Sequence, residues 1–276
     1  MRFIITEPLA EYLIQYLHQD DRAASVWRSP KESLAVLPSG VPDPNEYWTQ
    51  RKRLPETDII KKIWSKPRWC IWIRPTELKR ARFQNLEHCI DFMRSRSVRA
   101  DSLLPYPWVS SGTLEAGDEW IACEIDTMHQ LERWALFRSG QFVHNRAFDE
   151  GPNGQRVHVL EILDTVTQAF EFGARLAQQG VLSPKAAITF DLFGIAGQVL
   201  TWPADLSGYS NAVPSNCWCQ DESVSVARVM TTDELESRKR ELAFEVVLEI
   251  YSRFGWSSPP LERLSTEQGR RFGTID

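Results

Sequence analysis

Three carboxylates are the first residues in this sequence whose types and positions could support catalysis. Glu124 and Asp126 are two residues apart in an expected strand, so their side chains share one face, and Asp191 lies inside another expected strand. If these strands were neighbours, the three acids could hold Mg²⁺ for phosphodiester cleavage. Many nucleases add a lysine two residues from one carboxylate, and residues 124–128 contain none. The sequence favours the simpler interpretation, in which these acids lie on the solvent-facing side of a sheet.

The segment 51–99 carries the strongest functional signal. It has 14 Lys/Arg and 5 Asp/Glu, whereas the rest of the chain has 18 Lys/Arg and 32 Asp/Glu. The net charge of the whole chain is −5. Cations neutralise phosphates and aromatic rings stack on unpaired bases, so the segment could contact nucleic acid. The same cations could instead dock on an acidic protein surface, and this alternative is favoured. The candidate contact residues are Arg51, Lys52, Arg53, Lys61, Lys62, Trp64, Lys66, Lys79, Arg80 and Arg82.

Other kinds of site have weaker signals. Cys217 and Cys219 are separated by one residue and no second Cys/His pair follows, so buried thiols are favoured over a zinc site. Gly194 and Gly197 stand between two expected strands, where a hairpin turn explains them. The sequence has neither a G-x-G-x-x-G nor a Walker-type phosphate loop. We therefore expect no cofactor and no metal.

The elements that must position these residues follow from periodicity and turn signals. Apolar residues at helical spacing, with Thr231 and Glu234 as a capping box and Gly180 or Gly255 as stops, predict long helices. Alternation and the Ser139-Gly140 turn predict strands and a hairpin. The expected helices cover 76–94, 157–179 and 231–254, and the expected strands cover 68–74, 119–126, 132–138, 141–148, 185–193, 198–202 and 223–230.

Strands outnumber helices in this pattern. It predicts an α+β fold, with a mostly antiparallel sheet that carries two long helices. A short helix is expected at 9–18, and the prolines between 29 and 55 indicate a linker. We therefore expect a small N-terminal unit with its linker over 1–55, and an α+β domain over 56–276.

Composition indicates what class of protein this is and in which compartment we expect it. Charged residues make up 25% and hydrophobic residues 42% of the 276 positions, as in ordinary folded proteins. No apolar run is long enough for a transmembrane helix, and the first residues do not form a secretory signal. Five cysteines at low density are typical of reduced thiols. We expect a soluble cytoplasmic protein without membrane contact.

Several stretches together resemble a known protein group: Pro67–Glu77 with Ala81–Asn85, Glu132–His144, Ala169–Ala177 and Leu248–Trp256. They resemble the region that follows the AlbA/Schlafen-type domain in bacterial proteins described as DNA-binding or ATP-binding. The resemblance covers about residues 60–273. The hallmark of that domain, an acidic E-F-K-type start followed by an Ala-Phe-Ala-Asn…Gly-Gly segment, is missing from residues 1–60, so no functional residue is carried over. The resemblance implies an accessory or sensor module that works with a partner in regulation or antiviral defence.

These observations favour a non-catalytic module that binds a partner protein, a nucleic acid, or both. One alternative is a metal-dependent nuclease or another phosphodiester-processing enzyme that uses Glu124, Asp126 and Asp191. A second alternative is a structural subunit whose basic segment docks on another protein. The sequence does not decide whether the protein is an enzyme, but it favours a non-catalytic role.

Overall fold

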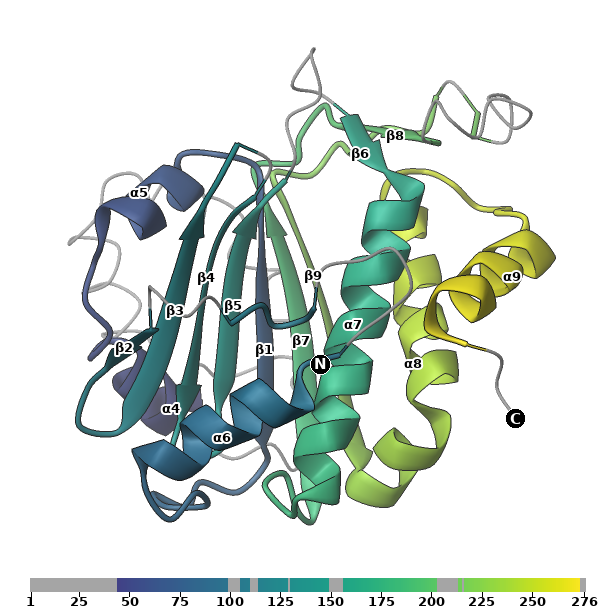
Figure 1. Cartoon of the computed structure of the whole chain (residues 1–276). Coiled ribbons are helices and arrows are strands. Elements are labelled where there is room, and N and C mark those ends of the chain that lie inside the picture. Colours follow the sequence, from purple (N-terminus) through teal and green to yellow (C-terminus); the bar gives the residue numbers. More distant parts are fainter. Residues whose placement is uncertain are drawn as a thin grey trace, which may run out of the picture. The chain divides into compact units, whose positions relative to one another are not determined.

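The computed structural model describes residues 44–98, 105–109, 114–128, 130–148, 156–202, 213–214 and 216–273. These residues contain a seven-stranded sheet in the order β2-β3-β4-β5-β1-β7-β9, and every neighbouring pair is antiparallel (Figure 1). The strands are β1 (Arg68–Pro75), β2 (Leu114–Ala116), β3 (Trp120–Asp126), β4 (Leu131–Phe137), β5 (Phe142–Ala147), β7 (Lys185–Phe193) and β9 (Ser223–Thr231).

A second, two-stranded sheet pairs β6 (Arg156–His158) with β8 (Val199–Thr201) in parallel. Helix α7 (Val159–Gln178) starts directly after β6 and leads back toward β7. The two-stranded sheet therefore lies at the N-terminal end of α7 and is separate from the main sheet.

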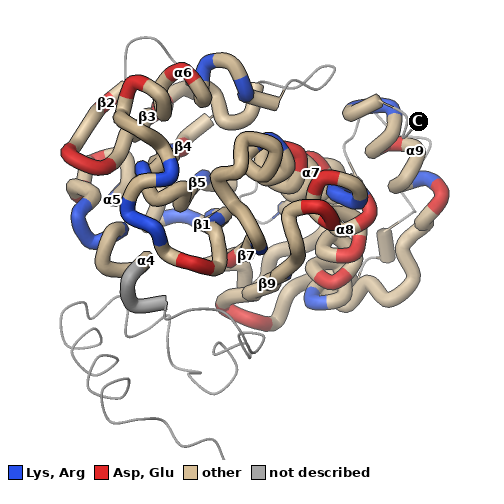
Figure 2. Tube along the Cα trace, turned by 90° about the horizontal axis from the view of Figure 1, so that it is seen from below, with Lys and Arg blue, Asp and Glu red and all other residues tan. Residues whose placement is uncertain are grey.

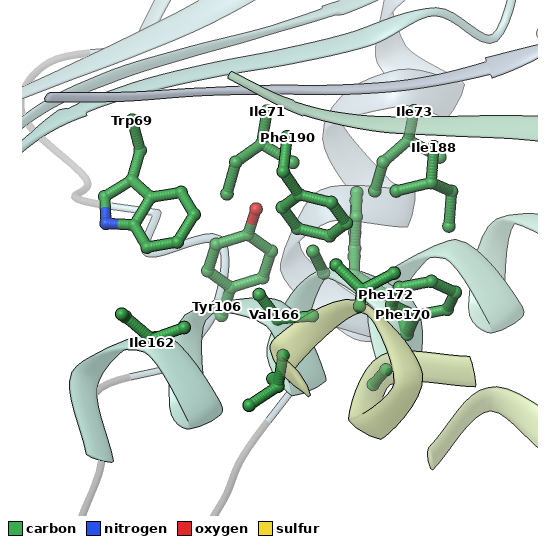
Figure 3. Packing of buried hydrophobic residues seen from close by; sticks show 14 of the residues in the cluster. Trp69, Ile71, Ile73, Tyr106, Ile162, Val166, Phe170, Phe172, Ile188 and Phe190 are labelled. Atoms are coloured by element: carbon green, nitrogen blue, oxygen red, sulfur yellow. The ribbon is translucent and has the colours of Figure 1, made fainter. Parts of the chain in front are cut away.

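The long helices α7 and α8 (Thr232–Arg253) pack on one face of the main sheet together with α6 (Leu86–Arg96), as Figure 1 shows. Side chains from alternate positions of β1 and β7, among them Trp69, Ile71 and Phe190, meet apolar side chains of α7 in the core (Figure 3). The closest ring pair in this layer is Phe142 with Phe172, whose centroids are 4.8 Å apart. Burial of these large apolar side chains is the main source of stability.

The opposite face of the sheet carries the short helices α4 (Pro44–Arg51) and α5 (Asp58–Trp64). A smaller apolar cluster lies there, formed by residues of β1, β3, β4 and β5 that include Cys70, Ala122 and Phe137. This face is thus partly covered: Glu124 is half-buried there, whereas Asp126, the last residue of β3, is exposed as predicted.

The predicted fold class is confirmed: the chain is α+β, with a mostly antiparallel sheet and two long helices packed on it. Most predicted strands and the Ser139-Gly140 hairpin are also confirmed. Of the predicted capping box, the structure shows the Thr231 cap, with the Glu234 amide donating to Thr231 Oγ1 over 3.2 Å, while the Glu234 side chain pairs with Arg238. The expected helix at 9–18 lies outside the described residues, and the domain boundary at 55 stays a prediction. In the described residues, no helix is both long and apolar enough to cross a membrane.

The helix expected over 76–94 begins ten residues later, at Leu86. Asn85 caps it, since the His88 amide donates to Asn85 Oδ1 over 2.8 Å. The backbone before Asn85 does not make helical hydrogen bonds at Arg82 and Phe83, because the amides of both residues donate to the carbonyl of Arg138. The turn of the β4–β5 hairpin therefore fixes this segment in a non-helical path.

Other expectations for connections were wrong. Gly194 and Gly197 do adopt positive φ values, but β7 pairs with β1 and β9 while β8 pairs with β6, so no hairpin joins β7 to β8. Part of the expected linker is helix α4, whose Tyr47 is buried. Helix α9 (Leu261–Phe272) begins directly after Pro259-Pro260 and lies outside the predicted helices. Proline is tolerated at the start of a helix, where its missing N–H has no intrahelical partner.

Candidate nucleic-acid and partner interface

Helix α5 is short but well anchored. The side chain of Thr57 caps it by accepting the Ile60 amide over 3.3 Å, and Asp58 adds a negative charge to the first turn. Ile60 and Ile63 are buried against the sheet. Because residues three apart share a helix face, Lys61 and Trp64 lie together on the outer side.

Trp64 is unusually exposed for a tryptophan, since 44% of its surface area is accessible to solvent. Lys61 is exposed beside it, and Arg68 donates from Nη1 to the Trp64 carbonyl over 2.9 Å. The Arg68 guanidinium also lies 4.7 Å from the centroid of the Phe193 ring. We use the name α5 surface for Lys61, Lys62, Trp64, Lys66 and Arg68.

Lys62 forms an exposed ion pair with the last residue of β3. Its Nζ lies 2.7 Å from Asp126 Oδ2, and this hydrogen-bonded partner raises the pKa of the ammonium group. Two residues beyond Asp126, Met128 is 89% exposed in the connection between β3 and β4. Apolar and cationic side chains are therefore both exposed at this end of the sheet.

The cations at 51–53 have different roles. Arg51 lies 3.5 Å from the centroid of Trp72 and 4.8 Å from that of Trp48, and its Nη2 is 3.8 Å from Cys70 Sγ. Arg53 pairs with Glu119 over 2.9 Å at the surface, and Lys52 is exposed. Arg51 therefore contributes to packing on the sheet, and it is a poor candidate for contact with a ligand.

The remaining candidates lie at the other end of β1. Strand β1 has eight residues and so spans about 26 Å, separating α5 from the segment that contains Lys79 and Arg80. Both of these are exposed, whereas Arg82 donates to the carbonyls of Ser183 and Glu77. Figure 2 likewise shows the basic residues of α5 and α6 in separate places. The basic residues that the structure describes between 51 and 98 therefore do not form one continuous patch.

The three carboxylates do not share a site. Strands β4, β5 and β1 lie between β3 and β7, which places Asp191 about 19 Å from the line of Glu124 and Asp126. Glu124 pairs with Arg133 over 3.1 Å and accepts a hydrogen bond from Thr57, while Asp126 pairs with Lys62. The condition for a shared Mg²⁺, neighbouring strands, is not met. Across the described ranges there is also no group of three or more His, Cys, Asp or Glu that could hold a metal ion.

The five cysteines are all free and buried, as expected for reduced thiols. Cys70, a member of the smaller apolar cluster, has polar neighbours on the sheet face that carries α4. It lies opposite Asp191 in the β1–β7 register, and Ser225 of β9 donates to Asp191 Oδ1 over 2.6 Å. Burial raises the pKa of the Cys70 thiol and raises that of Asp191 to about 6. Sequence reasoning missed these neighbours because they depend on the pairing of three distant strands.

A second polar group missed by the sequence lies inside the core. His144 Nδ1 is 3.2 Å from the Tyr106 hydroxyl, and His144 Nε2 is 3.2 Å from Glu132 Oε2. Burial alone would raise the pKa of Glu132, but His144 and Arg146 outweigh it and lower that pKa. His144 and Glu132 are only 1% and 3% exposed, so this group stabilises the core and does not face a ligand. The predicted hairpin placed both residues in adjacent strands, which was the only signal for their contact.

Comparison of the chain with protein-family models, curated proteins and solved structures finds no match in any of the three. The resemblance to the region beside AlbA/Schlafen-type domains therefore stays a prediction. Evidence for function comes from the geometry of the chain itself.

Proposed function

We propose that this protein is a non-catalytic binding module that contacts single-stranded nucleic acid through the α5 surface. The observation that carries the proposal is the exposed Trp64 ring beside Lys61 on the outer side of α5. An indole ring can stack on an unpaired base, while the exposed ammonium group of Lys61 beside it neutralises a phosphate. Tryptophan is also a common anchor in binding surfaces.

The geometry favours a single strand over a duplex. Stacking on Trp64 needs a base whose face is free, and the bases of a duplex are already stacked on each other. Buried Ile60 and Ile63 hold α5 on the sheet, so the ring is presented by a fixed element.

A fluorescence anisotropy titration with a labelled oligonucleotide of about 12 nucleotides tests the proposal, at about 50 mM and about 200 mM salt. Trp64→Ala is expected to weaken binding by about tenfold or more, because one stacked base is worth about 1–3 kcal/mol. Lys61→Glu is expected to weaken binding and to reduce its salt dependence.

The matched control is the double variant Lys79→Glu with Arg80→Glu. It reverses two exposed charges at the far end of β1, and the proposal expects it to bind almost as the wild type does. Absence of binding at about 50 mM salt, where phosphate contacts are strongest, would overturn direct nucleic-acid binding. Loss of binding only in the control would move the interface to the other end of the sheet.

We also propose that the module acts together with a partner protein, in bacterial regulation or antiviral defence. The support is the resemblance of residues 60–273 to a region that accompanies a separate nucleic-acid-handling domain. Purification from the native host, followed by size-exclusion chromatography, is expected to yield a stoichiometric complex. A single monomeric peak would contradict this part of the proposal.

A further inference from the structure

Arg74 of β1 is buried without an acidic partner. It is 5% exposed, and Arg74 and Arg133 are the two buried arginines among the residues that the structure describes. Arg133 pairs with Glu124, whereas no Asp or Glu of the described ranges forms an ion pair with Arg74. Arg74 Nη1 also has no hydrogen-bond partner there. A buried cation without a counter-ion is costly, so this guanidinium group is suited to receive an anion.

Arg74 lies where helix α4 meets the end of β1. Its guanidinium carbon is 5.0 Å from the centroid of the Tyr47 ring of α4. The turn between β4 and β5 holds α4 in this position, because Ser139 donates to Gln50 Oε1 over 2.7 Å. Gln141 Nε2 donates to the Tyr47 carbonyl over 3.2 Å. The contacts that surround Arg74 are therefore made by neutral groups, which fix its position without balancing its charge.

Arg82 adds a second cation at this place. Its Cδ packs on the same turn, 3.2 Å from a Cβ added at Gly140. Two of its nitrogens donate to backbone carbonyls, but its buried Nε has no hydrogen-bond partner in the part of the chain that the structure describes. Burial lowers the pKa of both Arg74 and Arg82, and the nearby Tyr47 hydroxyl opposes this effect in both. The two guanidinium groups are thus neighbours of the same ring.

The surrounding chain favours an anion that carries more than one charge. Between residues 74 and 86, Arg74, Lys79, Arg80 and Arg82 stand against Glu77 as the one acid. Lys79 and Arg80 are exposed, so they add positive potential at the surface beside the buried group. A phosphate monoester carries up to two negative charges and three acceptor oxygens, and its geometry matches the arginine fork.

We propose that Arg74 and Arg82 form a binding site for the phosphate group of a small ligand. Arg74 Nη1 and Arg82 Nε are the donors available to it, and the phosphate supplies the counter-ion that Arg74 lacks. Six residue steps along β1 place this site about 20 Å from Arg68 of the α5 surface. The phosphate site is therefore separate from the proposed contact with nucleic acid.

Thermal unfolding of the full chain in inorganic phosphate, at constant ionic strength, tests the site. Phosphate at about tenfold its dissociation constant is expected to raise the melting temperature by about 3 °C. Acetate at the same concentration is expected to raise it less, because it carries a single charge. No rise in phosphate up to about 20 mM would overturn the proposal, as would an equal rise in acetate.

Arg74→Met distinguishes a ligand site from a structural role. The variant removes the buried charge and fills much of its space, so without phosphate it should melt at or above the wild-type temperature. It should also lose the response to phosphate. A large drop in melting temperature without phosphate would show that Arg74 has a structural partner, and it would overturn the proposal. A full phosphate response in Arg74→Met would do the same.

Arg175→Met is the matched control. Arg175 is a half-buried arginine whose pKa is also lowered by burial, but its Nη1 donates to the carbonyls of Arg96 and Ser97. Because those bonds are lost, the variant should melt at a lower temperature without phosphate, yet keep the full rise in phosphate. Loss of the phosphate response in Arg175→Met as well would show that the response is not specific to Arg74.

The oligonucleotide titration separates the two sites. Arg74→Met is expected to bind the oligonucleotide as the wild type does, since the α5 surface is unchanged. If Arg74→Met loses oligonucleotide binding together with the phosphate response, phosphates of the nucleic acid occupy Arg74, and the assignment to a small ligand is overturned. If no variant binds the oligonucleotide but the phosphate response depends on Arg74, the phosphate site stands without the proposed nucleic-acid contact.

Discussion

Glu124 of β3 lies directly opposite Arg133 of β4, with 3.1 Å between Glu124 Oε1 and Arg133 Nε. Their side chains are only 12% and 4% exposed, and Arg133 also donates to the carbonyl of Pro55 over 2.7 Å. The pair therefore fixes the residues before α5 on the sheet. An acid that the sequence offered as a metal ligand is instead part of the support for the α5 surface.

Loss of Arg133 is expected to be costly. Arg133→Met leaves the Glu124 carboxylate buried without its cation, which lowers the free energy of unfolding by about 3 kcal/mol. Urea denaturation measures the change, and the double variant with Glu124→Gln should recover much of it. Lys62→Met, in the exposed pair with Asp126, is the control and should change stability little. Equal effects of Arg133→Met and Lys62→Met would contradict the importance of burial.

Asp191 is expected to make stability depend on pH. Burial raises its pKa to about 6, against the opposing effects of the Ser225 hydrogen bond and Arg51. Because the unfolded group titrates near pH 4, the folded state gains a proton, and this contribution to stability is lost as pH rises from about 4 to about 6. Asp191→Asn should remove that slope, a difference of up to about 3 kcal/mol. Urea unfolding of both proteins across this range measures it, and parallel curves would refute the prediction.

Glu132 is expected to give stability the opposite dependence on pH. Its lowered pKa means that the folded state favours the charged carboxylate, so its contribution is present above about pH 4.5 and is lost as pH falls further. Glu132→Gln should therefore destabilise the protein at pH 7 by about 2 kcal/mol, and less in acid. Thermal melts at several pH values test this. A penalty that stays constant down to pH 3 would show that packing, and not charge, is lost.

Gly140 in the β4–β5 turn is expected to tolerate no side chain. It has a φ of +85°, and an added Cβ would lie 2.7 Å from Val181 Cγ1. Gly180 has a φ of +70°, but no atom lies within 4 Å of its added Cβ. Both alanine variants carry the backbone penalty, of about 1 kcal/mol, and only Gly140→Ala adds a steric clash. Differential scanning calorimetry should show the larger drop in melting temperature for Gly140→Ala, and equal drops would exclude the clash.

The helix that presents Trp64 shows how far the candidate site could be predicted. The sequence identified Trp64 and its cationic neighbours, but not the helix, because a helix of only seven residues is too short to give a clear periodic pattern. Helix α5 contacts β3, β4 and β5, and burial of Ile60 and Ile63 stabilises it there. The sequence also did not show that the α5 surface and the residues Lys79 and Arg80 are separate, because that follows from the length and direction of β1.

The sequence by itself determined the local elements with strong patterns: the strands at 68–74 and 185–193, the hairpin at Ser139-Gly140, the long helices, and hence the α+β class. These depend on neighbouring residues, through alternation, capping and turn chemistry. Only the tertiary structure decided that β1 lies between β5 and β7, which separates Asp191 from Glu124 and brings it to Cys70 and Ser225. Pairing of distant strands depends on which faces bury one another, and that choice leaves no local trace in the chain.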